Sequence, residues 1–285
     1  MNSTASKSEQ AQASEHLAVL GCGKMGTILL QAFLQKGLVS REGVIATVQH
    51  EERASAISKQ MGITVGTDNR AAVSGASTVL VCVKPQTMSQ LLDEISPSLK
   101  SDALVISIVA SAPLKFIQQR LGNNKAVLRA MPNTPASVGA AMTAIATGSH
   151  AGDAHLTLAR QMFESVGRVA VVDEKHMDAV TALSASGPAF VFVILESMAE
   201  AGVKVGLPRE LATLLAAQTL FGSAHLALQT GHHPALLKDA VTTPAGCTID
   251  GIMELEKGGL RVTIMSAIVK ATQRARELMS EPVSS

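Results

Sequence analysis

The stretch LAVLGCGKMG, from Leu17 to Gly26, decides the fold: a short apolar run ends in a G-x-G-x-x-G loop and leads into a helix-forming segment. In such a loop Gly21 permits a tight turn, Gly23 leaves room for a pyrophosphate against the backbone, and Gly26 lets helix and strand pack closely. The first N–H groups of the helix are free to bind phosphates. The loop therefore predicts a dinucleotide site, and a glycine turn of purely structural use is the alternative.

Outward from this loop, the chain divides into two parts with different periodicity. Short β-branched runs alternate with amphipathic stretches up to about Asp173, which predicts βαβ units and a mainly parallel sheet. Beyond that point the sequence predicts helices separated by proline and glycine breakers. The expected fold class is α/β, with an N-terminal Rossmann-like dinucleotide-binding domain and a C-terminal all-helical dimerisation domain. The expected bounds are a disordered tail at 1–15, the nucleotide domain at 16–173 and the helical domain at 174–285.

The expected strands are LAVLG, GVIATV, ITVG, TVLVCV, ALVISIVA, AVLRAM, TAIAT and RVAVV. The expected helices are Met25–Lys36 and Glu51–Met61 in the first part, and Lys175–Leu183, Pro188–Lys204, Pro208–Thr230, Pro234–Val241, Thr248–Lys257 and Leu260–Met279 in the second. The segment Pro188–Val203 is apolar on too many positions for a helix with one exposed side, so we expect it to be buried, within the chain or against a second subunit.

Composition narrows the class of protein. The 285 residues are 47% hydrophobic and 16% charged, with a net charge of +1, which gives no electrostatic reason to expect nucleic acid or an anionic membrane as a partner. The longest apolar run, Ala189–Leu195, is far shorter than the roughly 20 residues that span a bilayer. We therefore expect a soluble cytoplasmic protein that acts on a small molecule.

The three cysteines, Cys22, Cys82 and Cys247, argue against a disulfide framework, because they are odd in number and form no CxxC pair. His232 and His233 have no other ligand at metal-binding spacing, so no metal is expected. All three cysteines fall in segments assigned to the site, which predicts an activity that thiol reagents inhibit.

The end of the second strand bears on the choice of coenzyme. An acidic residue about 20 positions after the glycines would hold the ribose of NAD. The run from Thr47 to His50 contains no carboxylate. This favours NADPH, with NADH as the alternative, and makes Gln49, His50 and Arg53 candidates for the 2′-phosphate. The competing interpretation is that Arg53 is a solvated helix residue among acidic neighbours.

Two more strands end at the same edge of the predicted sheet. VCVKPQT places Lys84-Pro85 there, and ISIVAS ends at Ala110-Ser111. Open α/β sheets bind ligands at the carboxyl ends of their strands. Lys84 is a candidate for the site, with an ordinary surface charge as the alternative, and the small residues after ISIVA leave room for a nicotinamide ring.

The run VTTPAGCTIDG, Val241–Gly251, combines hydroxyls, glycine and a predicted helix start. A helix N-terminus binds carboxylates well, and Gly246 permits close approach of the backbone. The alternative is helix capping, with a threonine at the N-cap and a proline in the first turn. One cap would not account for three hydroxyls crowded beside a glycine.

Five motifs resemble, in order and spacing, those of the pyrroline-5-carboxylate reductases: GCGKMG, VCVKP, RAMPNTP (Arg129–Pro135), LSASGPAF (Leu183–Phe190) and VTTPAGCTIDG. The likeness covers nearly the whole chain after the tail, and its most specific part is Pro234–Glu256. Such enzymes reduce 1-pyrroline-5-carboxylate to L-proline with NAD(P)H, the last step of proline synthesis. The sequence departs from the family at Val48 and Gln49, where many bacterial members carry a polar residue and an arginine, and at Gly231, where some members have a glutamate.

The resemblance implies a dimer through the helical domain, and assembly to a decamer as a further step. It assigns the substrate pocket to Thr243, Gly246, Cys247 and Thr248. The full set of expected coenzyme contacts, from the loop and from the resemblance, is Leu20, Gly21, Cys22, Gly23, Lys24, Met25, Gln49, His50, Arg53, Asn69, Cys82, Val83, Lys84, Pro85, Ile108, Val109 and Ala110.

The chemistry of that substrate fits the residues. Hydride attack on the C=N carbon leaves electron density on nitrogen, which a positioned donor stabilises. Thr248 is the candidate, to orient the imine or to relay a proton from water. Two alternatives stay open: a related imine or β-hydroxyacid reductase, for which Lys204 and Lys238 are weak catalytic candidates, and a catalytically silent relative that senses a ligand.

Overall fold

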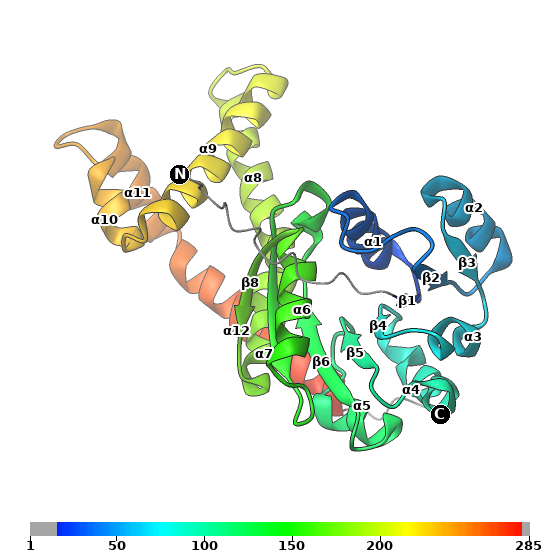
Figure 1. Ribbon diagram of the computed structural model, residues 1–285. Coiled ribbons are helices and arrows are strands. Elements are labelled where there is room, and N and C mark those ends of the chain that lie inside the picture. The colour runs from blue at the N-terminus through cyan, green and yellow to red at the C-terminus, as the bar shows by residue number, and fades with distance from the viewer. Residues whose placement is uncertain (1–15, 281–285) are drawn as a thin grey trace, which may run out of the picture. The chain divides into compact units, whose positions relative to one another are not determined.

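The computed structural model describes residues 16–280, with side chains as far as residue 278. The predicted tail, residues 1–15, lies outside the described residues. The chain divides into two compact units, of which the first holds the residues up to Ala185 together with those from Thr272 onward, and the second spans Ser186–Ala271. Figure 1 labels the helices and strands of both.

An eight-stranded sheet forms the centre of the first unit, in the order β3-β2-β1-β4-β5-β6-β7-β8. Only β6 and β7 pair antiparallel, so the prediction of a mainly parallel sheet is confirmed. The order reverses beside β1, which lies between β2 and β4. The strands are β1 (Leu17–Leu20), β2 (Val44–Thr47), β3 (Thr64–Gly66), β4 (Thr78–Val81), β5 (Leu104–Ser107), β6 (Ala126–Met131), β7 (Ala141–Thr147) and β8 (Gly167–Val171).

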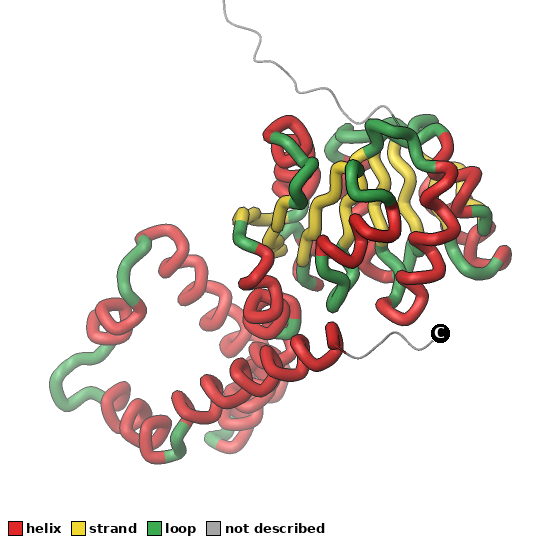
Figure 2. Tube along the Cα trace, turned by 90° about the horizontal axis from the view of Figure 1, so that it is seen from below, coloured by secondary structure: helices red, strands yellow, loops and turns green. Residues whose placement is uncertain are grey.

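Helices cover both faces of this sheet, as Figure 2 shows. Asp68 caps α3 by accepting a hydrogen bond from the Ala71 N–H at 3.0 Å, and Pro85 occupies the first turn of α4, where its missing N–H costs nothing. The helices of this unit are α1 (Lys24–Gln35), α2 (Glu51–Met61), α3 (Asn69–Ser74), α4 (Pro85–Ile95), α5 (Leu114–Leu121), α6 (Asp153–Glu164) and α7 (Met177–Val180). Short 3-10 turns occupy Ser96–Ser98, Thr134–Val138 and Glu174–His176, and a π-helical turn occupies Thr181–Ala185.

Side-chain alternation along the strands divides the core into two layers. In β1, Leu17 and Val19 belong to the layer beneath α1, α2 and α6, while Ala18 and Leu20 belong to the layer beneath α3, α4 and α5. All four of these side chains are buried, as expected for a strand of a parallel sheet that is covered on both faces. The strands β4, β5 and β6 are likewise buried along their whole length, whereas β3 and β8 at the two edges of the sheet are partly exposed.

Helices are the only regular elements among the described residues of the second unit: α8 (Gly187–Lys204), α9 (Arg209–Thr230), α10 (Pro234–Ala240), α11 (Cys247–Lys257) and the first half of α12 (Leu260–Ser280). Helices α8 and α9 pack together. A Cβ at Gly202 of α8 would lie 2.9 Å from the Cβ of Ala212, so the glycine is what permits this close approach. The predicted all-helical character of this part is confirmed.

Two expectations for the helical part need correction. Within the single chain, α8 is largely exposed, with Phe192 and Val193 61% and 62% exposed, so the expectation of burial inside the chain is wrong. The segment expected as one helix from Lys175 to Leu183 is instead a 3-10 turn, the short α7 and a π-helical turn. Its hydrogen-bond pattern changes twice, which the apolar spacing did not indicate.

Two helical stretches, Glu174–Lys204 and Arg209–Thr230, are long and apolar enough to cross a membrane by length and composition. The uninterrupted apolar run Ala189–Leu195, in contrast, is too short to predict a membrane-spanning segment. An apolar helix of a self-associating protein passes the same test, because the face that a partner would cover is exposed in one chain.

Candidate functional site

The glycine turn after β1 has the geometry that the motif predicts. Gly21 adopts a φ of +73°, and a Cβ there would lie 2.5 Å from Cγ1 of Val83. At Gly26 a Cβ would lie 3.4 Å from Sγ of Cys82, so α1 packs closely against the end of β4. At Gly23 a Cβ would meet only the Gly21 carbonyl oxygen, at an ordinary contact distance of 3.7 Å, so this glycine is the least crowded of the three. As predicted, Gly21 forms the tight turn, Gly23 is open to approach by a ligand, and Gly26 lets α1 pack closely.

Some backbone N–H groups of the turn donate within the protein, and others have no acceptor in α1. The Cys22 N–H donates to the Thr47 carbonyl at 2.7 Å and the Gly23 N–H to the Gly21 carbonyl at 2.6 Å. The first N–H of α1 with a helical partner is that of Thr27, which donates to Gly23. The three preceding N–H groups, of Lys24, Met25 and Gly26, have no intrahelical acceptor, as at any helix start. These are the donors left for an anion.

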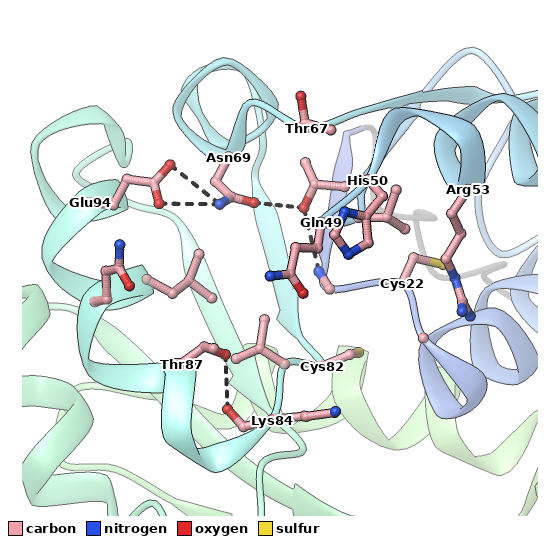
Figure 3. A pocket seen from close by; sticks show the side chains of 17 residues that line it. Cys22, Gln49, His50, Arg53, Thr67, Asn69, Cys82, Lys84, Thr87 and Glu94 are labelled. Atoms are coloured by element: carbon pink, nitrogen blue, oxygen red, sulfur yellow. Dashed lines mark hydrogen bonds between the residues drawn. The ribbon is translucent and has the colours of Figure 1, made fainter. Parts of the chain in front are cut away.

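A cavity of about 510 Å³ lies beside this turn, at the carboxyl ends of β1, β2 and β4. This is the switch point of strand order, where open α/β sheets bind ligands. Figure 3 shows its side chains. Of the expected coenzyme contacts, the cavity brings together Gly21, Cys22, Gly23, Gln49, His50, Arg53, Asn69, Cys82, Val83 and Lys84.

The remaining expected contacts do not line the cavity: Leu20, Lys24, Met25, Pro85, Ile108, Val109 and Ala110. Leu20 and Val109 have buried side chains that belong to the core, so only their backbone could face a coenzyme. Lys24 and Met25 supply free N–H groups rather than side chains, as described above. For these residues contact with the coenzyme stays a prediction.

Sequence reasoning missed one wall of the cavity. Helix α4 contributes Thr87, Gln90, Leu91 and Glu94, and Thr47 and Thr67 also line the space. The spacing of the α4 residues, three or four apart, places them along one stripe of a helix. This spacing could have identified α4 as a wall of the cavity, but the sequence analysis does not predict a helix at these residues.

The charged residues of the cavity differ in how they are held. Arg53 forms no ion pair among the described residues, and its acidic neighbour Glu51 instead accepts a hydrogen bond from the Thr67 hydroxyl at 2.7 Å. Lys84 also faces the space (Figure 3). Neither cation is ion-paired within the described part of the chain, although the carboxylate of Glu94 also lines the cavity, so an anionic ligand suits the part near Arg53 and Lys84.

The second predicted cluster lies in the helical unit, in the loop before α11. Gly246 is the N-cap of α11, and no side chain caps this helix, so the alternative of a threonine N-cap is wrong. A Cβ at Gly246 would lie 2.5 Å from Oγ1 and 3.2 Å from the backbone oxygen of Thr243, so any larger residue would force Thr243 to shift. The hydroxyls of Thr243 and Thr248 have no hydrogen-bond partner among the described residues, and Thr248 is half-buried in the first turn. The loop thus presents free N–H and hydroxyl donors.

Backbone strain marks both clusters. Among the described residues, Ser111 and Ala245 are the non-glycine residues with positive φ, at +62° and +57°. Ser111 follows β5 at the ligand-binding edge, and Ala245 precedes the N-cap of α11. Left-handed non-glycine residues cost about 1–3 kcal/mol and gather at functional sites.

One member of the histidine pair has a structural contact. Nδ1 of His233 accepts a hydrogen bond from the Ala235 N–H at 3.2 Å and so caps α10. Across residues 16–280, no three histidine, cysteine or acidic side chains gather as ligands.

The thiols are expected to react unequally. Burial raises the pKa of Cys22, and it raises the pKa of Cys82 well above its usual value, with the neighbouring Cys22 adding to the shift. Because the thiolate is the nucleophile, both are expected to resist iodoacetamide at neutral pH, while the exposed Cys247 is expected to react about tenfold faster or more. Mass spectrometry of the partly alkylated protein would measure this.

The same reagent tests the predicted thiol sensitivity. If Cys247 is the sensitive group, loss of activity should follow its modification, and Cys247→Ser should remain active after the same treatment. Equal loss of activity in Cys247→Ser would assign the sensitivity to Cys22 or Cys82 instead.

Fold and site together define a class: an NAD(P)H-dependent oxidoreductase with a Rossmann-like domain and a helical dimerisation domain. Residues 16–111 match a family described as NADP oxidoreductase, coenzyme F420-dependent, and residues 174–278 match pyrroline-5-carboxylate reductase dimerisation. The chain is 42% identical over 265 residues to the pyrroline-5-carboxylate reductase of Methanosarcina acetivorans, covering 93% of this chain and 98% of that one. The protein belongs to the pyrroline-5-carboxylate reductase family.

Solved structures agree with this assignment. The pyrroline-5-carboxylate reductase of Coxiella burnetii has 32% sequence identity and a TM-score of 0.86, with 93% of this chain and 98% of that chain covered. The Plasmodium falciparum pyrroline carboxylate reductase, solved with NADP bound, has 27% identity and the same TM-score over 95% of this chain and 100% of that one.

Proposed function

We propose that this protein reduces 1-pyrroline-5-carboxylate to L-proline with NADPH, as the last step of proline biosynthesis. The observation that carries the proposal is the cavity at the glycine turn, in a chain that matches reductases of this name along nearly its whole length. The reaction moves a hydride from the nicotinamide to the carbon of the C=N bond, and a proton completes the amine.

The pyrophosphate is assigned to the start of α1. The N–H groups of Lys24, Met25 and Gly26 lack helical acceptors, and the positive end of the helix dipole favours an anion there. Gly23 has no side chain and only one neighbour within 4 Å of its Cβ position, which would let the phosphates approach the backbone. Leu20, Pro85 and the segment Ile108–Ala110 remain assigned to the coenzyme as proposals that follow from the resemblance.

NADPH is preferred in this proposal because the cavity offers Gln49, His50 and Arg53 after β2, where a carboxylate would select NADH. Within residues 16–280 Arg53 forms no ion pair that a phosphate would have to displace. A guanidinium suits a phosphate, with which it can form two parallel hydrogen bonds.

Arg53→Ala is expected to raise KM for NADPH about tenfold, since a hydrogen bond to a charged group contributes about 1.5 kcal/mol. KM for NADH should stay within about twofold, because NADH lacks the 2′-phosphate. The matched control is Lys59→Ala, which removes one positive charge from the same helix at an exposed residue outside the cavity. Equal changes for the two coenzymes, or for the two variants, would contradict the assignment.

The substrate is assigned to the loop before α11. Its carboxylate would accept from the free N–H groups at the helix start, with Thr243, Gly246 and Cys247 around it. Thr248 would donate to the imine nitrogen or relay a proton from water to it. The substrate enters as an iminium ion or is protonated in the site, so no strong acid is required.

Self-association follows from the dimerisation domain of the family, to which residues 174–278 correspond. The exposed apolar side chains of α8 and α9, Phe192, Val193, Leu214 and Phe221 among them, support a partner subunit as their cover. We propose residues 16–173 and 174–285 as the functional domains, a cytoplasmic location, and a dimer that assembles further into a decamer.

The test is oxidation of NADPH by 1-pyrroline-5-carboxylate, followed at 340 nm. The chain has no Trp or Tyr, so its own near-ultraviolet background is low. Saturable turnover that yields L-proline is expected, with KM lower for NADPH than for NADH. Turnover with cyclohexenyl imines or β-hydroxyacids alone would indicate a related reductase, and binding without turnover would indicate a ligand-sensing protein. Light scattering measures the assembly.

A further inference from the structure

The half-buried carboxylate of Glu94, near the end of α4, lies against an amide at the start of α3. Nδ2 of Asn69 donates to Oε1 and Oε2 of Glu94 at 3.3 and 3.2 Å. Both residues line the cavity, and Figure 3 shows these contacts on the opposite side of the view from Arg53. Since Nδ2 can only donate and a carboxylate can only accept, Glu94 fixes which end of the amide faces it.

The fixed amide in turn orients a hydroxyl. With Nδ2 held by Glu94, Oδ1 of Asn69 faces Thr47 and accepts its hydroxyl proton at 2.7 Å. The Thr47 hydroxyl has one proton, so its lone pairs are left to accept, and the Gly21 N–H donates to it at 3.4 Å. The donors run in one direction, from Gly21 through Thr47 and Asn69 to Glu94.

Thr47 connects this relay to the glycine turn. Its side chain is 2% exposed, and its carbonyl accepts the Cys22 N–H at 2.7 Å while its hydroxyl accepts the Gly21 N–H. Two successive residues of the turn are therefore held by one residue of β2. Without Glu94 the Asn69 amide could rotate by 180°, which would place a donor against the Thr47 hydroxyl and leave its proton without an acceptor.

We propose that Glu94 is a positioning residue that holds the coenzyme-binding turn in shape through Asn69 and Thr47. The role depends on the acceptor oxygens of Glu94 and not on its negative charge. This inference deepens the proposed function, because it assumes that the cavity binds NADPH.

Glu94→Ala is expected to raise KM for NADPH about fivefold, the effect of losing about one hydrogen bond. The values of kcat and KM for 1-pyrroline-5-carboxylate should change less than twofold. Glu94→Gln keeps an acceptor oxygen and is expected to restore KM for NADPH to within about twofold of wild type. A purely structural defect would lower Tm and the active fraction without this selective change in one KM.

Arg70→Ala is the matched control. Nε of Arg70 donates to the backbone carbonyl of Glu94 at 3.1 Å, so this variant removes a second hydrogen bond between the same two helices and leaves the relay intact. It should leave KM for NADPH unchanged. If it raises KM as much as Glu94→Ala does, helix docking explains the effect and the proposal is overturned.

Two further results would also overturn it. A Glu94→Gln enzyme as impaired as Glu94→Ala, or one with a lower KM for NADPH than wild type, would show that the charge acts directly on the coenzyme. In a Thr47→Val background the effect of Glu94→Ala should vanish, because contacts within one network are not additive; additive effects would exclude the relay. Wild-type protein without saturable NADPH turnover would instead refute the proposed function.

Discussion

Thr248→Ala is expected to lower kcat/KM for 1-pyrroline-5-carboxylate about 100- to 1000-fold, the effect of removing one donor from a preorganised site, about 2.7–4 kcal/mol. The Thr248 hydroxyl has no partner among the described residues, so it is free to donate to the imine nitrogen as hydride arrives. KM for NADPH should not change. Steady-state rates at 340 nm, with each substrate varied in turn, measure both effects.

The substitution at Thr248 leaves the helix intact, because alanine is a better helix former than threonine and no capping bond is lost. Thr248→Ser retains the hydroxyl and should keep most of the activity. An alanine enzyme with kcat/KM within twofold of wild type would remove Thr248 from the mechanism. A serine enzyme as impaired as the alanine enzyme would assign the effect to the lost methyl group.

Glu174→Ala is expected to lower the free energy of unfolding by about 3 kcal/mol, seen as a fall of roughly 6–12 °C in Tm. The reason is Arg129 of β6, which is 1% exposed and lies with Nη1 3.4 Å from Oε1 of Glu174. Burial lowers the pKa of the Arg129 guanidinium, while Glu174 and Asp178 oppose that shift. Removing Glu174 leaves a buried charge with a weaker counterion and also removes the acceptor of the Leu114 N–H at 2.6 Å.

The reverse substitution should cost much less. Arg129→Met removes the charge together with Nε and Nη2, which are buried without a hydrogen-bond partner in the described structure. Glu174 would still accept from Leu114, and Asp178 would still face Arg276 at 3.8 Å. We expect a loss below about 1 kcal/mol, and recovery of much of the stability in the double variant. Thermal scans would measure Tm for each variant at one protein concentration, because the Tm of a self-associating protein depends on its concentration. A larger loss in Arg129→Met than in Glu174→Ala would contradict this account.

The helices and strands were largely predictable because their signals are local. Each of the eight apolar runs forms a strand, and the expected helix Glu51–Met61 has the same bounds in the structure. The segment Lys175–Leu183 was not predictable in detail, because the chain entering it is held by distant elements: Glu174, directly before it, accepts the Leu114 N–H of α5 and pairs with Arg129 of β6.

The candidate site was predictable where it lies on motifs and missed where it depends on packing. The glycine turn, Asn69 and Lys84 all line the cavity. Glu94 and its neighbours on α4 carry no motif, and Glu94 reaches Asn69 across 25 positions of the chain. The burial expected for α8 could not be assigned either, since apolar spacing predicts a covered face but does not say what covers it.

Local signals specify the α/β order, the glycine turn and the loop before α11, because backbone preferences and apolar periodicity act over a few residues. Folding in three dimensions is what buries Arg129 against Glu174 and brings Thr47 to Gly21 and Glu94 to Asn69. These properties depend on burial and hydrogen-bond partners, which come from elements 22 to 45 residues apart. A pattern of a few neighbouring residues therefore cannot predict these contacts.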